Sequence, residues 1–115
     1  MQDTLDMAME LNCEFANFYS TMAYPGSKLY LDALREGWEL PETYVGFSQH
    51  SYETHPLSTK HISAAEVLGF RDEAFTKYYT SDRYLDMIEE KRGKATRQSI
   101  EDMTKIKLKR KLLGD

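Results

Sequence analysis

The sequence predicts a small, mostly α-helical protein. Three observations carry this prediction: apolar residues recur at helical spacing over residues 64–79, capping residues precede the predicted helices, and Gly or Asn follows them. The 115 residues are 41% hydrophobic and 30% charged, so the chain has enough apolar surface for one small core.

The N-terminal segment predicts a short helix followed by a strand. Residues 3–11 have apolar residues on one face and Asn12 as a stop, which is typical of a short amphipathic helix. The next residues, Phe15 to Met22, are rich in aromatic side chains and end before Tyr24-Pro25-Gly26, which favours a β-strand and a turn. A single strand leaves its backbone without partners, so we expect it to belong to a sheet that this chain does not contain.

A second helix and a long loop follow the turn. Ser27 is predicted to cap a helix that runs to about Glu36 and stops at Gly37, with one face formed by Leu29, Tyr30, Ala33 and Leu34. Residues 38–62 show no clear periodicity and include Pro41 and Pro56, which indicates a loop.

The C-terminal half predicts three helices. Ser63 and Glu66 form a capping box for residues 64–79. A shorter helix is expected over 82–92 and ends at Gly93; a last one is expected over about 96–113. The buried faces of the first two comprise Ala64, Val67, Leu68, Arg71, Ala74, Phe75 and Tyr78, then Tyr84, Leu85 and Ile88; the last carries Ile100, Met103, Ile106 and Leu113.

Charge is unevenly distributed along the chain. Residues 1–90 hold six Lys or Arg and sixteen Asp or Glu, whereas residues 91–115 hold nine and three. The basic end makes a partner-binding surface one hypothesis, and the overall charge of −4 argues against nucleic acid as that partner. The candidate residues are Lys105, Lys107, Lys109, Arg110 and Lys111.

The sequence predicts no catalytic residue and no metal site. His50, His55 and His61 share one loop, but neither they nor Cys13 have the paired short spacing of zinc ligands. The lone cysteine and the lack of a long apolar run or signal peptide predict a cytoplasmic protein with no membrane segment.

The motif Tyr24-Pro25-Gly26-Ser27-Lys28-Leu29-Tyr30 resembles the end of the last barrel strand in radical S-adenosylmethionine enzymes that carry a cobalamin-binding domain. In that class the strand ends in Tyr-Pro-Gly-Thr/Ser-x-Leu-Tyr. The following residues, including Gly37-Trp38, Ser48-Gln49-His50 and the stretch 64–75, look like the C-terminal extension of the same enzymes. Some of these are magnesium-protoporphyrin monomethyl ester cyclase-like.

The resemblance implies that the chain is an accessory C-terminal fragment of such an enzyme. Residues 1–30 would be the last helix-strand-turn of an incomplete β/α barrel, 31–62 a loop-rich connector, and 63–115 a helical C-terminal region. The fragment would cover the barrel and shape the pocket for a small-molecule substrate through Tyr24, Pro25, Gly26, Ser27 and Tyr30. Its partner would be the rest of the parent chain, the barrel and the cobalamin domain.

The resemblance also implies where the cofactors lie. The family's cluster motif has three cysteines, so one cysteine cannot hold the cluster. The fragment is therefore expected to hold no cofactor and to catalyse nothing alone. The parent would carry the 4Fe-4S cluster and S-adenosylmethionine, and cobalamin if its N-terminal domain has kept that site. The alternative is an autonomous helical module that binds a protein or RNA partner through its basic C-terminal helix.

Overall fold

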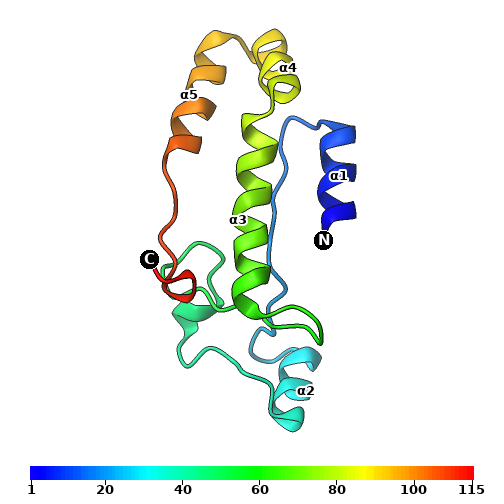
Figure 1. Cartoon of the computed structure of the whole chain (residues 1–115), viewed down its shortest axis with the longest axis vertical. Helices are drawn as coiled ribbons and strands as arrows, with labels where there is room; N and C mark the ends of the chain where they lie inside the picture. Colours follow the sequence, from blue (N-terminus) through cyan, green and yellow to red (C-terminus); the bar gives the residue numbers. More distant parts are fainter. The chain divides into compact units, whose positions relative to one another are not determined.

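A computed structural model describes all 115 residues and is mostly helical (Figure 1). Helical residues make up 57% of the chain and no strand is present. The α-helices are α1 (Gln2–Leu11), α2 (Lys28–Glu36), α3 (Ala64–Thr80), α4 (Asp82–Arg92) and α5 (Lys94–Lys105). Two short 3-10 helices, η1 (Tyr44–Phe47) and η2 (Lys111–Leu113), complete the order.

The helices begin and end at the residues that the sequence marks. Ser27 caps α2 by accepting from the Tyr30 amide at 3.1 Å, and Gly37 ends it at φ 72°. Ser63 accepts from the Glu66 amide at 3.2 Å, while the Glu66 carboxylate accepts from the Ser63 amide at 2.9 Å. The capping box predicted for α3 is therefore confirmed.

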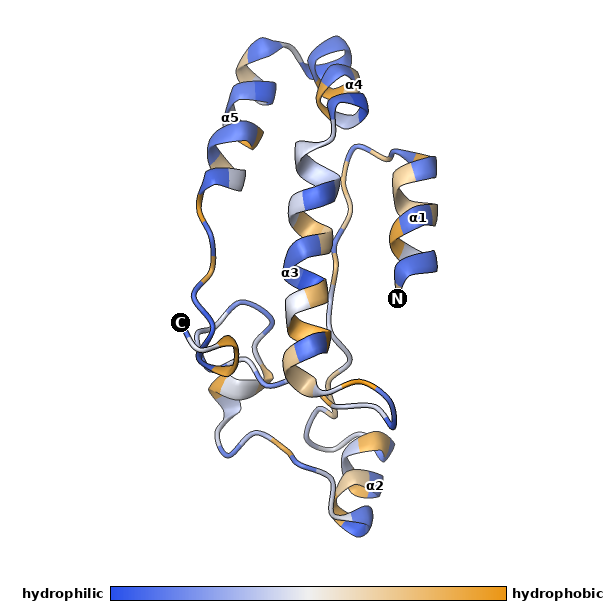
Figure 2. Cartoon of the chain, viewed as in Figure 1, coloured by the Kyte–Doolittle hydropathy of each residue, from blue (hydrophilic) through white to orange (hydrophobic).

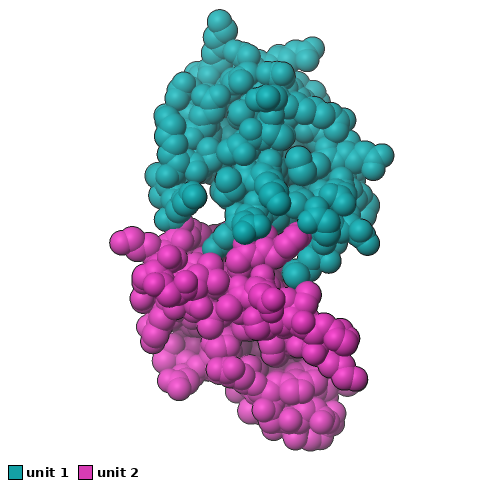
Figure 3. Space-filling model, in the orientation of Figure 1, with its two compact units in different colours: residues 1–18, 72–107 teal, residues 19–71, 108–115 magenta.

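The chain divides into two compact units, each built from two segments that are distant in sequence (Figure 3). Unit 1 comprises Met1–Phe18 and Asp72–Lys107. Unit 2 comprises Tyr19–Arg71 and Leu108–Asp115. These boundaries differ from the contiguous expectation of 1–30, 31–62 and 63–115, because the last eight residues join the central segment of the chain.

The core of unit 1 is a cluster of tyrosines and aliphatic residues. Tyr78, Tyr79 and Tyr84 are each at most 3% exposed, and their ring centroids lie 5.1 Å apart. Leu85 and Ile88 of α4 complete the buried group, as the helical spacing predicts. Side chains from α1, α5 and the segment after α1 pack against it: Ala8, Met9, Ala16, Phe18, Phe75, Met87 and Ile100.

The predicted strand over residues 15–22 is wrong. This segment has no ladder partner, and side chains bind its backbone instead. The Tyr79 hydroxyl accepts from the Ala16 amide and donates to the Ala16 carbonyl, while Gln49 does the same for Ser20. Because these side chains satisfy the backbone, the segment needs no neighbouring strand.

The predicted last helix is also too long. Helix α5 ends at Lys105, and residues 106–110 have no helical structure before η2. Figure 2 shows α5 as mostly hydrophilic, and none of its residues is buried. The expected apolar stripe is therefore incomplete: Met103 is 40% exposed and Ile106 is 76% exposed. Without burial, nothing favours continuing the helix to Leu113.

Candidate functional site

The turn at Tyr24–Ser27 is a compact, hydrogen-bonded structure at the start of α2, in unit 2. Ser27 Oγ donates to the Tyr24 carbonyl at 2.6 Å, and the Ser27 amide donates to the same carbonyl at 3.0 Å. Gly26 has φ 87°, a region that side-chain-bearing residues rarely adopt. The one hydroxyl of Ser27 thus holds the turn on one side and caps the helix on the other.

The two tyrosines of the motif share one aromatic neighbour. The rings of Tyr24 and Tyr30 lie 6.2 Å and 6.5 Å from the ring of Phe47 in η1. Gln49 donates to the Tyr24 hydroxyl at 3.2 Å. Tyr24 remains 47% exposed, so its ring is fixed on one side and open to solvent on the other. The sequence placed Tyr24 and Tyr30 together but offered no signal for Phe47 or Gln49.

Helix α2 carries an exposed apolar face beside this turn. Leu31 and Leu34 are 60% and 57% exposed, and Trp38 just beyond the helix is 45% exposed. The spacing of Leu31 and Leu34 puts them on one side of the helix. Ala33 is fully buried on the opposite side. The predicted inner face therefore holds for Ala33 but not for Leu34, which points away from the core.

The basic residues near the C-terminus do not form the expected surface. Lys105, Lys107, Lys109 and Lys111 are exposed, but Arg110 is fully buried. Its guanidinium donates to the carbonyls of Gln49 and Ser51 and to Thr54 Oγ1 at 2.9–3.0 Å. Arg110 is thus a structural residue of unit 2, and a partner-binding role for it is wrong.

Arg110 differs from its lysine neighbours in one chemically relevant way. A guanidinium has five donors in a planar fork and can bind several carbonyls at once, which an ammonium does less well. That single Arg in a run of lysines is the only sequence signal for this contact.

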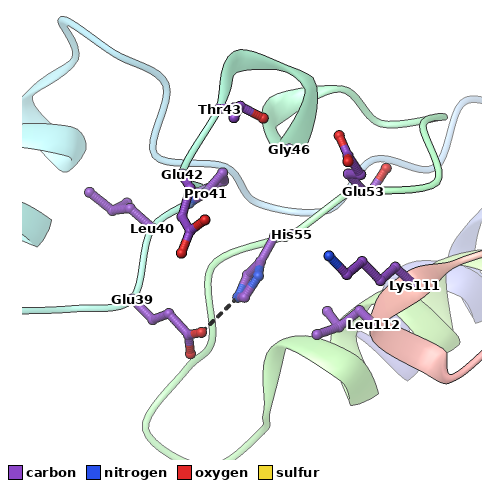
Figure 4. A pocket seen from close by; sticks show the side chains of 11 residues that line it. Glu39, Leu40, Pro41, Glu42, Thr43, Gly46, Glu53, His55, Lys111 and Leu112 are labelled. Atoms are coloured by element: carbon purple, nitrogen blue, oxygen red, sulfur yellow. Dashed lines mark ion pairs between the residues drawn. The ribbon is translucent and has the colours of Figure 1, made fainter.

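A polar hollow of about 520 Å³ lies in unit 2, near η2 (Figure 4). His55 and Glu39 face each other across it, with 3.8 Å between His55 Nε2 and Glu39 Oε1. Lys111 points into the same hollow. The remaining walls comprise Leu40, Pro41, Glu42, Thr43, Gly46, Glu53, Thr54 and Leu112. Its open, charged walls suit small polar molecules, and none of the predicted barrel-mouth residues lines it.

The histidines and the cysteine do not gather. His50 lies 3.3 Å from the Arg71 guanidinium, whereas His55 faces Glu39. Cys13 is exposed, and no three His, Cys, Asp or Glu side chains are grouped to hold a metal. With one cysteine, the residues present do not fit an iron–sulfur cluster.

Three tyrosine hydroxyls form an unexpected polar layer in unit 1. Tyr78, Tyr79 and Tyr84 donate to the carbonyls of Cys13, Ala16 and Glu14. Burial raises the pKa of Tyr84 to about 12 and raises the pKa of Tyr78 as well. These hydroxyls therefore stay protonated as donors at neutral pH.

Charge around the same segment is compensated on the surface. The Glu14 carboxylate accepts from the Arg92 guanidinium at 2.8 Å and lies 3.6 Å from the Lys91 ammonium. The Arg92 hydrogen bond is the main cause that lowers the pKa of Glu14. The segment after α1 therefore carries no uncompensated negative charge at this residue.

Comparison with family models, curated proteins and solved structures gives no match for this chain. No helix in the structure is both long and apolar enough to cross a bilayer. The residues themselves therefore carry the functional argument, and the turn at Tyr24–Tyr30 is the feature in which sequence motif and ordered geometry coincide.

Proposed function

We propose that this chain is an accessory, non-catalytic segment of a larger radical S-adenosylmethionine enzyme of the cobalamin-dependent type. In this proposal it docks on the remainder of its parent and helps to shape the substrate pocket. The observation that carries the proposal is the turn Tyr24–Tyr30, in which the residues of the motif form one ordered, solvent-exposed structure.

The geometry of the turn suits a wall of a pocket. Ser27 and Gly26 fix the path of the backbone, and Phe47 and Gln49 fix the orientation of Tyr24. A ring that is held on one face and open on the other can contact a substrate at little conformational cost. Such a wall positions a substrate and needs no reactive group of its own.

The exposed face of α2 supports the docking part of the proposal. Leu31, Leu34 and Trp38 leave apolar surface in water beside the turn. Contiguous exposed apolar side chains often mark a surface that a partner covers. A neighbouring domain of the parent would bury them and bring the turn to its substrate.

The test is Gly26→Ala in the full-length enzyme, compared with Gly37→Ala. Both glycines have positive φ, and neither has an atom within 4 Å of a built Cβ, so each substitution strains the backbone by about 1–2 kcal/mol. We expect Gly26→Ala to lower substrate turnover by roughly tenfold or more, since small displacements of a positioning group are costly.

The matched variant separates the turn from general strain. Gly37→Ala is expected to leave turnover within about twofold, because Gly37 only ends α2. The absorbance of the cluster should be the same in both variants. Equal turnover in the two variants would remove the turn from the substrate pocket, and a native reading frame without a three-cysteine cluster motif would remove the parent enzyme altogether.

A further inference from the structure

The backbone of unit 1 contains a short extended segment that one helix already pairs on one side. Both the amide and the carbonyl of Ala16 bind the Tyr79 hydroxyl of α3, at 3.0 Å and 2.7 Å. The Glu14 carbonyl, two residues earlier, binds Tyr84 in the same unit. A residue whose amide and carbonyl point to the same side is typical of extended backbone.

Exposure along the segment alternates in the same way. Glu14, Ala16 and Phe18 are half-buried, whereas Phe15 and Asn17 are exposed. This period of two is the period of a strand. The segment runs beside α3 as a chain without helical turns (Figure 1).

The other edge of the segment is unpaired. In extended backbone the amides and carbonyls of Phe15 and Asn17 point away from Tyr79, because successive residues alternate. Neither residue makes a hydrogen bond within the chain. Phe15 is also 76% exposed, although it is a large apolar side chain. Such an edge is a template for another extended chain.

We propose that residues 14–18 pair with the same residues of a second copy of this chain, as two antiparallel strands related by a twofold axis at Ala16. Phe15 of each copy then lies opposite Asn17 of the other. Each such pair exchanges two hydrogen bonds, so the two pairs use all four edge donors and acceptors of each copy. The edge is therefore complementary to itself.

Side chains and charge favour this occupant. In this register the two Phe15 side chains are diagonal neighbours on one face, within reach of each other. Glu14 is neutralised by Arg92 and Lys91 in its own chain, so two copies meet without like-charge repulsion there. The interface is small, and we expect a weak dimer with a dissociation constant on the order of 100 μM. This inference does not depend on the proposed function.

Sedimentation equilibrium from about 10 μM to 1 mM tests the proposal, with Asn17→Pro compared against Asn17→Ala. Proline removes the Asn17 amide donor, which no contact within the chain uses, and its demand for an extended preceding residue suits Ala16. Two of the four hydrogen bonds are lost, so we expect about thirtyfold weaker dimerisation, or about 2 kcal/mol. The alanine variant keeps the donor and should dimerise like the native chain.

A second variant keeps the proposal open to refutation if proline disturbs folding. Phe15→Lys puts two charges at the diagonal position and should abolish the dimer, whereas Tyr44→Lys, at an 83% exposed residue of unit 2, should not. In native protein, amide exchange at Phe15 and Asn17 should slow as concentration rises. A native chain that stays monomeric at 1 mM, or equal dimerisation of Phe15→Lys and Tyr44→Lys, would overturn the inference.

Discussion

The Arg110 guanidinium ties the C-terminal residues to the loop at 49–54. It is fully buried and donates to two carbonyls and one hydroxyl. Burying a cation is costly unless hydrogen bonds replace its water, and here three acceptors do so. The same three acceptors lose their partner if the guanidinium is removed.

Replacing this arginine should destabilise the protein. We expect Arg110→Met to lower the free energy of unfolding by about 2–4 kcal/mol, because buried acceptors are left unsatisfied. Lys109→Met is the matched control, since Lys109 is exposed and should change stability by less than about 0.5 kcal/mol. Urea unfolding measures both. Similar values for the two variants would show that the buried contact contributes little.

The buried Tyr84 hydroxyl predicts a loss of stability at alkaline pH. Its pKa is raised from 10.0 to about 12, mainly by burial, so the folded state holds its proton more tightly than the unfolded state. Its contribution is fully present below pH 10 and is lost as the pH rises from 10 to about 12, by an amount on the order of 2–3 kcal/mol. Urea unfolding at several alkaline pH values should show a smaller decline in Tyr84→Phe; an unchanged decline would contradict this assignment.

At the scale of elements, tyrosine hydroxyls replace a neighbouring strand. The segment after α1 is extended, yet its backbone partners are the side chains of α3 and α4. A helix can satisfy an extended segment only where side chains of the right length face it. Tyr79 has that length, and one hydroxyl can both donate and accept.

Removing one hydroxyl should loosen the segment. Tyr79→Phe leaves the Ala16 amide and carbonyl without their partner, and we expect a loss of about 1–3 kcal/mol in the free energy of unfolding. Tyr44→Phe, at an 83% exposed ring, is the control and should be neutral. Chemical denaturation compares the two, and faster amide exchange at Ala16 would locate the effect. A neutral Tyr79→Phe would mean that water can replace the hydroxyl.

The helices were predictable because their signals are local. Ser27 and Ser63 each cap a helix from within three residues, and Gly37 and Gly93 follow the last turns. The turn of the candidate site is local too, since Ser27 both closes it and caps α2. Patterns of this kind survive whatever the rest of the chain does.

The errors all involve residues that are distant in sequence. Tyr79 lies 63 residues after Ala16, and Arg110 lies 59 residues after Ser51. An aromatic-rich extended segment predicts a strand unless the tyrosines that bind it are known. Likewise, a run of lysines with one arginine predicts a solvated helix unless its carbonyl partners are known. Phe47 and Gln49 escaped prediction because their loop has no periodicity.

At the scale of the whole molecule, each unit is closed by a segment from the opposite end of the chain. Unit 2 receives its last eight residues after the chain has passed through unit 1. Besides Arg110, the Lys111 amide donates to the Tyr52 carbonyl at 2.9 Å, and the Tyr52 hydroxyl donates to the Asp115 carbonyl at 3.1 Å. The C-terminal residues thus act as a strap across the loop that contains Tyr52.

Deleting residues 108–115 should therefore loosen unit 2 and spare unit 1. The amides of Thr54 and His55 report on the loop, because they donate to the carbonyls of Ser51 and Gly46. We expect their hydrogen exchange to accelerate on the order of a hundredfold, since the loop loses every contact with the strap. Exchange in α4 and α5 should stay within about threefold, because Leu85, Ile88 and the ion pairs of Arg97 with Asp86, Glu89 and Glu101 all lie in unit 1. Equal acceleration in both units would mean that they unfold as one, and unchanged exchange at Thr54 and His55 would mean that the loop holds its shape without the strap.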